Sequence, residues 1–149
     1  MSPEPLQPSL EALDELFGFE AICAFLTEDE RPFGGALGLV DWRLCGAVSR
    51  VVKSGFFSAG PSERLLLPTD GRVAPEKIFV VGLGRRGSVT TMRLEHELDK
   101  AARMLEGAGV ASVALTFAQL PRAVDAVRDE LLQRSFVGLF PGRVGLFAG

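Results

Sequence analysis

Three glycines lie between an apolar segment and a helix-forming segment, at a spacing that nucleotide-binding proteins use. Gly82, Gly84 and Gly87 in "VVGLGRRGS" fit the pattern G-x-G-x-x-G. In a dinucleotide site such glycines let a pyrophosphate approach the first N–H groups of a helix, where the partial positive charge favours an anion. Dinucleotide binding is therefore the first candidate chemistry.

Two features of the surrounding sequence argue against a dinucleotide. The motif normally opens the first strand–helix–strand unit, whereas several elements precede it here. The strand that follows should end in an acid for the ribose hydroxyls, and "ALTFAQL" contains none. The plainer interpretation is a tight strand-to-helix turn, in which a left-handed backbone or close packing requires glycine.

A third interpretation keeps an anion site without a dinucleotide. Arg85 and Arg86 stand beside the start of the helix, where their guanidinium groups and the helix N-terminus could hold a small anion. We expect the preceding turn to lie next to this loop. The candidate ligand-binding residues are Gly82, Gly84, Arg85, Arg86, Gly87, Ser88, Thr69 and Asp70.

No set of residues in the sequence assembles a catalytic centre. His96 is the only histidine, and its charged neighbours in "RLEHELDK" indicate a solvated helix face rather than a metal ligand. Cys23 and Cys45 stand in apolar contexts, so we expect two buried thiols. The acids at 28–30 read as an exposed turn. We predict no catalytic residue, no metal and no cofactor.

Composition narrows the class of protein. The 149 residues suit one domain, and 47% of them are hydrophobic. A net charge of −3 gives no general attraction to nucleic acid or anionic lipid, and Trp42 beside Arg43 is weak evidence for stacking on a base. The start "MSPEPLQPSL" lacks the features of a secretory signal, and no apolar run reaches the ~20 residues of a membrane span. We expect a cytoplasmic protein.

Hydrophobic periodicity and turn residues predict alternating helices and strands. They are a loose arm at 1–8, a helix capped by Ser9, a strand at 19–26, a helix at 41–53, strands at 64–69 and 77–83, helices at 88–108 and 122–135 flanking a strand at 110–117, and a last strand within 136–149. Alternation with fully apolar strands predicts a three-layer α/β/α fold around a mixed, mostly parallel sheet.

The order of these elements resembles the N-terminal domain of the leucyl aminopeptidase family, peptidase family M17. The likeness lies in the "SGFFSAG" loop, "RLLLPT", "FVVGLGRRG", "LDKAARMLEGAG" and "VASVALTF", and it covers most of residues 19–135. The resemblance implies a macro-domain-like fold without catalytic residues. The two-metal peptidase centre of that family lies in a C-terminal domain, whose "NTDAEGR" motif is not in this sequence.

The resemblance leads to one expected function and two alternatives. We expect a stand-alone, non-catalytic module that self-associates or binds another protein, because this domain helps to build the family's hexamer. One alternative is a module that binds a nucleotide, ADP-ribose or another small anion near 82–88. The other is a chain that is similar to aminopeptidases but lacks their activity. Nucleic acid and membranes are not expected partners.

Overall fold

Six strands form one sheet, and the computed structural model describes residues 2–149. The strands are β1 (Glu4–Leu6), β2 (Ala21–Leu26), β3 (Arg64–Pro68), β4 (Lys77–Gly82), β5 (Ser112–Phe117) and β6 (Arg143–Phe147). Their order across the sheet is β1-β6-β5-β2-β4-β3. Only β3 runs antiparallel to its neighbour, so the predicted mixed, mostly parallel sheet is confirmed.

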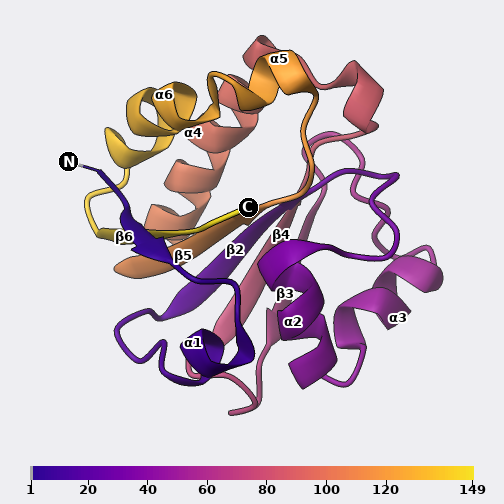
Figure 1. Ribbon diagram of the computed structural model, residues 1–149, viewed down its shortest axis with the longest axis vertical. Helices are drawn as coiled ribbons and strands as arrows, with labels where there is room; N and C mark the ends of the chain where they lie inside the picture. The colour runs from indigo at the N-terminus through magenta and orange to yellow at the C-terminus, as the bar shows by residue number, and fades with distance from the viewer. Residues whose placement is uncertain (1) are drawn as a thin grey trace.

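Helices cover both faces of this sheet (Figure 1). They are α1 (Leu10–Asp14), α2 (Gly35–Arg43), α3 (Ala47–Lys53), the 3₁₀ turn η1 (Arg86–Ser88), α4 (Thr91–Gly107), α5 (Arg122–Asp125), α6 (Arg128–Leu132) and the π-helical η2 (Gln133–Val137). The core of one face contains side chains from α1, α2 and α3. The core of the other contains side chains from α4, α5, α6 and η2. This is the predicted three-layer arrangement.

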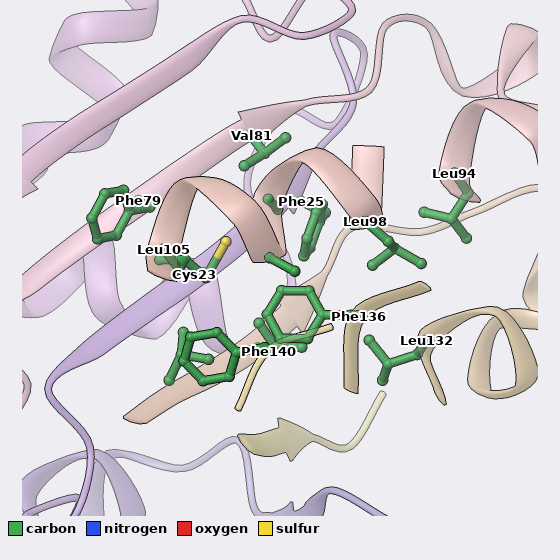
Figure 2. Close-up of a cluster of buried hydrophobic side chains, with 14 of the residues drawn as sticks. Cys23, Phe25, Phe79, Val81, Leu94, Leu98, Leu105, Leu132, Phe136 and Phe140 are labelled. Atoms are coloured by element: carbon green, nitrogen blue, oxygen red, sulfur yellow. The ribbon is translucent and has the colours of Figure 1, made fainter. Parts of the chain in front are cut away.

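The central strand β2 shows why the sheet needs helices on both faces. All six of its residues are buried, and they alternate between the two cores. Cys23 lies in the core beneath α4, among the aromatic rings of Phe79, Phe136 and Phe140 (Figure 2). Burial raises the pKa of the Cys23 thiol to about 12, so this thiol stays protonated and unreactive.

The C-terminal end of the chain agrees with the prediction, and the N-terminal end differs from it. The tail forms β6, which pairs with β5 on one side and β1 on the other, as predicted for a last strand within the core. The arm at 1–8 is not loose throughout, because Glu4–Leu6 form the edge strand β1. Arg143 of β6 binds the Glu4 carboxylate through both Nε and Nη2, and this pairing holds the proline-rich arm in place.

The predicted helix at 41–53 is two helices. The backbone turns between α2 and α3 at Cys45 and Gly46, whose φ angles are 57° and 80°. Asp41 does cap a helix, but from a distance, since its carboxylate accepts the N–H groups of Val48 (2.8 Å) and Ser49 (3.2 Å) at the start of α3. Cys45 is exposed at this turn, so the prediction of two buried thiols holds only for Cys23.

Two other helices also differ from their predicted boundaries. The long helix α4 is capped by the Thr90 hydroxyl, which accepts the N–H of Arg93 at 3.0 Å, and not by Ser88, which lies in η1. The predicted helix at 122–135 is divided into α5, α6 and η2. Ser9 caps α1 as predicted, through a 3.1 Å bond from Ala12 N–H.

Candidate functional site

Three turns meet at one edge of the sheet because the parallel strands β2, β4 and β5 all end there. Leu26 pairs with Gly82 at the end of β4, and Phe25 pairs with Phe117 at the end of β5. In open α/β sheets, ligands bind outside the carboxyl ends of the strands, where neighbouring connections leave toward opposite faces. The connection after β2 leads to α2 on one face, and those after β4 and β5 lead to α4 and α5 on the other.

The glycine motif lies at this edge, and packing explains two of its three glycines. A Cβ on Gly82 would lie 2.1 Å from the carbonyl oxygen of Gly60, so a side chain there would collide with the neighbouring loop. Gly84 has a φ of 83°, in the left-handed region, and a Cβ would meet the Pro61 ring at 3.0 Å. Gly87 has open space around it. The first two glycines of the motif therefore form a tight strand-to-helix turn, and the third is not required by packing.

Three backbone N–H groups of this turn, those of Leu83, Gly84 and Arg86, already have partners. Leu83 N–H donates to Leu26, and Gly84 N–H donates to Ala59, both at 2.9 Å. The N–H of Arg86, which an anion would approach, donates instead to the Asp29 carboxylate at 3.0 Å. This backbone hydrogen bond is the main reason that the pKa of Asp29 lies below its ordinary value.

The structure separates the eight predicted binding residues into two groups. Gly82, Gly84, Arg85, Arg86, Gly87 and Ser88 share the carboxyl edge. Thr69 and Asp70 follow β3, which runs antiparallel to β4, so they lie at the other end of β4. There the Thr69 N–H donates to the carbonyl oxygen of Glu76. Six residues of strand, roughly 20 Å, separate the two places. The expectation that the two turns are neighbours is wrong.

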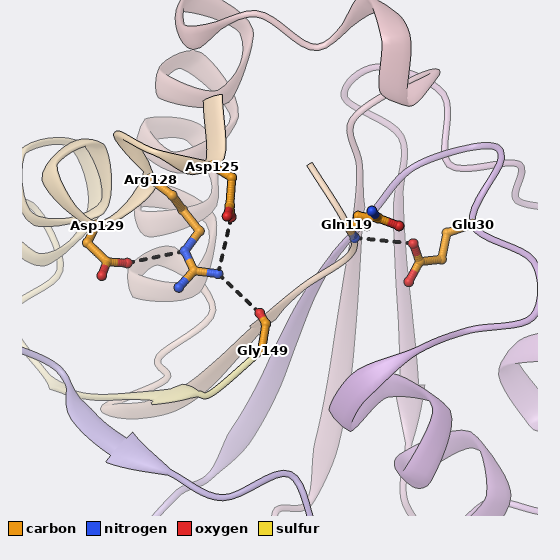
Figure 3. A network of polar contacts seen from close by, with 6 residues as sticks. All are labelled: Glu30, Gln119, Asp125, Arg128, Asp129 and Gly149. Atoms are coloured by element: carbon orange, nitrogen blue, oxygen red, sulfur yellow. Dashed lines mark hydrogen bonds and ion pairs between the residues drawn. The ribbon is translucent and has the colours of Figure 1, made fainter. Parts of the chain in front are cut away.

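A crevice opens at the same edge, between the turns that follow β2 and β5. Its volume is about 540 Å³, and its walls include Gly34, Gly35, Phe117 and Gln119. The carboxylate of Glu30 spans these two walls, and Figure 3 shows its contact with Gln119. Its Oε1 accepts the N–H of Gln119 and its Oε2 accepts the N–H of Gly34, each at 3.2 Å. One side chain thereby joins two turns that are 89 residues apart in the sequence.

Arg128 forms a second polar cluster near the crevice (Figure 3). Its Nε lies 3.2 Å from Asp129, its Nη1 lies 3.9 Å from Asp125, and Nη1 also donates to the Gly149 carbonyl at 3.5 Å. The guanidinium carbon lies 5.3 Å from the centre of the Phe117 ring. Two carboxylates therefore balance Arg128. The crevice wall itself contains Arg122, together with the acids Glu30 and Asp125.

Sequence reasoning missed the residues that matter most at this edge. The sequence predicts an exposed turn for Glu30 and Asp29, yet both accept backbone N–H groups from other turns. Gly34 is the N-cap of α2 and Gly35 is its first residue, at the end of the connection that follows β2. That pair of glycines at a helix start is the signal that could have pointed to the crevice.

Other candidate chemistry finds little support in the structure. His96 is exposed on α4. Among residues 2–149, histidine, cysteine and carboxylate side chains form no group of three that could hold a metal ion. In the same part of the chain, every helix is too short or too polar to cross a membrane.

Comparison with known proteins identifies the family. The model of the cytosol aminopeptidase family, N-terminal domain, matches residues 24–137. The chain belongs to this family of domains. A probable cytosol aminopeptidase of Geobacter sulfurreducens is 34% identical over 107 residues, which is 71% of this chain. The match covers 22% of that relative's length, so the chain corresponds to about a fifth of that protein.

Solved structures show the same fold at low sequence identity. A mutant of tomato leucine aminopeptidase superposes with a TM-score of 0.72 at 14% identity, covering 99% of this chain and 32% of that one. The macrodomain of Thermus aquaticus DarG superposes with a TM-score of 0.67 at 12% identity, covering 98% and 97%. Thermosipho africanus DarTG, solved in complex with ADP-ribose, gives 0.61 at 10% identity, covering 87% and 38%. The macro-domain-like fold is thus confirmed.

Proposed function

We propose that this aminopeptidase N-domain acts without catalysis, as a cytoplasmic module that associates with copies of itself. The observation that carries the proposal is Trp42, which belongs to α2 and is 66% exposed. Exposed tryptophans are uncommon on isolated domains and are enriched at the centres of protein interfaces. The match to an N-terminal domain that is one part of a larger enzyme supports the same conclusion.

The surroundings of Trp42 suit an interface. Arg43 lies 5.5 Å from its ring and pairs with Asp14 of the preceding segment at 2.7 Å. A hollow of about 640 Å³ opens beside Trp42, with Phe33 and Cys45 among its walls. A side chain of a partner protein can fill such a hollow and contact the aromatic and arginine side chains beside it.

Two more exposed aromatic side chains belong to the same layer of helices. Phe17 follows α1 and is 80% exposed, and Phe56 follows α3 and is 81% exposed. The helices α1, α2 and α3 cover one face of the sheet (Figure 1). Burying such aromatic side chains against a second copy removes apolar area from water and favours association.

Light scattering coupled to size-exclusion chromatography tests this proposal. The wild-type chain is expected to form an oligomer whose population rises with concentration, and Trp42→Ala is expected to be monomeric at the same concentrations. Met92→Ala is the matched control, because Met92 is 81% exposed but belongs to α4 on the other face. A monomeric wild-type chain, or equal loss of association in both variants, would contradict the proposal.

A second candidate function is binding of a phosphorylated ligand such as ADP-ribose at the carboxyl edge. It is favoured by the crevice between the turns that follow β2 and β5, whose two walls contain the backbone N–H groups of Gly34 and Gln119. Its location also matches the edge where open α/β sheets bind ligands. Thermal melting with ADP-ribose, NAD, ATP and phosphate tests it, since a ligand that binds only the folded state raises the melting temperature.

A further inference from the structure

The acidic turn that follows β2 occupies the carboxyl edge of the sheet. Glu28, Asp29 and Glu30 are consecutive, and two of them accept backbone N–H groups from other turns. Asp29 accepts from Arg86 in the glycine turn after β4, and Glu30 accepts from Gln119 in the turn after β5 and from Gly34 at the start of α2. The acidic turn is thus hydrogen-bonded to the start of α2 and to the turns after β4 and β5.

Glu30 holds its two N–H donors in the manner of a bound oxyanion. The two oxygens of a carboxylate share one carbon, so N–H groups 3.2 Å from each oxygen converge on a space the size of one acid group. Backbone N–H groups that converge in this way, with one at a helix start, are the elements from which phosphate sites are built. The nine-residue helix α2 starts here, and its N-cap residue, Gly34, has no side chain that could accept the first N–H groups of the helix.

The turn is braced in this position by its own neighbour. Arg31 Nη1 donates to the carbonyl oxygens of Glu30 (2.7 Å) and Thr27 (3.3 Å). At the base of the turn, Thr27 is 1% exposed and its hydroxyl forms no hydrogen bond of normal geometry. Most buried hydroxyls find a partner. The Thr27 hydroxyl is near enough to the Asp29 carboxylate to help to lower the pKa of that carboxyl, so it also supports the turn.

We propose that the crevice is a latent site for a phosphorylated ligand and that Glu30 keeps it closed as a built-in competitor. The inference rests on the second candidate function and adds its regulation. A phosphoryl group needs the N–H groups of Gly34 and Gln119, which Glu30 already holds. It would also meet the negative charges of Glu30 and Asp125, which both line the crevice, and like charges at close range repel. Arg122 in the crevice wall supplies the cation that an incoming anion needs once Glu30 has moved.

Isothermal titration calorimetry with inorganic pyrophosphate and with ADP-ribose tests the proposal on the full chain. Glu30→Ala is expected to bind at least one of them with a Kd lower by about tenfold or more than the wild-type chain. Pyrophosphate binding alone assigns a bare phosphate site, and preference for ADP-ribose shows that the rest of the crevice contributes. Glu106→Ala, an exposed acid near the end of α4, is the control for the change in net charge.

The possible outcomes test the blocking role of Glu30 separately from the existence of the binding site. Wild-type binding as tight as that of Glu30→Ala would support the second candidate function and overturn the role of Glu30. No binding by Glu30→Ala, with its cooperative melting transition retained, would overturn both. Glu30→Gln keeps the shape of the side chain and removes its charge, so it is expected to bind more weakly than Glu30→Ala and more tightly than wild type. It also provides a folded variant if Glu30→Ala does not fold.

Discussion

The hydroxyl of Ser62 donates a 2.7 Å hydrogen bond to Glu97, a carboxylate with no exposed surface. Ser62 belongs to the loop before β3, and Glu97 belongs to α4, so the bond ties the loop to the helix layer. Arg93 Nη1 donates to the same oxygen of Glu97 at 3.1 Å. The "RLEHELDK" segment indicated a solvated acid at this position, but α4 turns Glu97 toward the loop.

Glu97→Ala is expected to lower the free energy of unfolding by about 1–3 kcal/mol, because it leaves the part-buried Ser62 hydroxyl without its acceptor. Urea unfolding followed by circular dichroism measures the loss. Glu97→Gln should lose less, since its amide oxygen can still accept from Ser62. An equal loss for the exposed Glu106→Ala would show that the effect is one of net charge and not of this contact.

Gly82→Ala and Gly87→Ala separate packing from ligand binding in the glycine motif. A methyl group at 82 would lie 2.1 Å from the Gly60 carbonyl, so we expect a loss of about 2 kcal/mol or more, within the range for overpacked sites. At 87 the methyl group has open space, and the change should be neutral or slightly stabilising. Melting temperatures of the two variants, measured without ligand, check this. Equal tolerance at both positions would remove the packing explanation.

The two cysteines should differ in their reaction with a thiol reagent. Cys45 is exposed, whereas Cys23 is buried and has its pKa raised to about 12 by that burial. Titration with Ellman's reagent is expected to modify one thiol per native chain and two in guanidinium chloride. Cys45→Ala should leave none that reacts in the native state. Rapid modification of both thiols in the native wild type would contradict the burial of Cys23.

Acid should loosen β1 through its ion pair with β6. The hydrogen bonds from Arg143 hold the pKa of Glu4 below its ordinary value of 4.5. A lowered folded-state pKa means that this contribution to stability is complete above pH 4.5 and is lost as the pH falls through the folded value. The Ala148 N–H donates to the carbonyl oxygen of Leu6 in β1 at 2.9 Å, so its protection factor, which is corrected for the pH dependence of intrinsic exchange, should then fall, as measured by NMR. Glu4→Gln should show the lower protection factor at every pH.

The fold was more predictable than the site, for physical reasons visible in particular residues. Fully apolar strands such as Ala21–Leu26 and the alternation with helices determine the layered architecture, since both sheet faces must be covered. Helix boundaries at 43–47 depended on the left-handed backbone of Cys45, which apolar periodicity does not report. The partners of Glu30 lie up to 89 residues away, so its role required the three-dimensional structure.

Hydrolysis of a leucine amide with added Mn²⁺ or Zn²⁺ tests the absence of catalysis directly. We expect no metal-dependent turnover by the purified chain, because the family model that matches it describes the N-terminal domain, and its match to the Geobacter relative covers 22% of that protein. Two-metal hydrolysis also needs a cluster of ligands, and residues 2–149 bring together no three side chains of the required types. A full-length cytosol aminopeptidase is the positive control. Turnover that co-purifies with this chain, persists after a second chromatographic step and is lost with a chelator would overturn the non-catalytic function and require a metal site formed on folding or assembly.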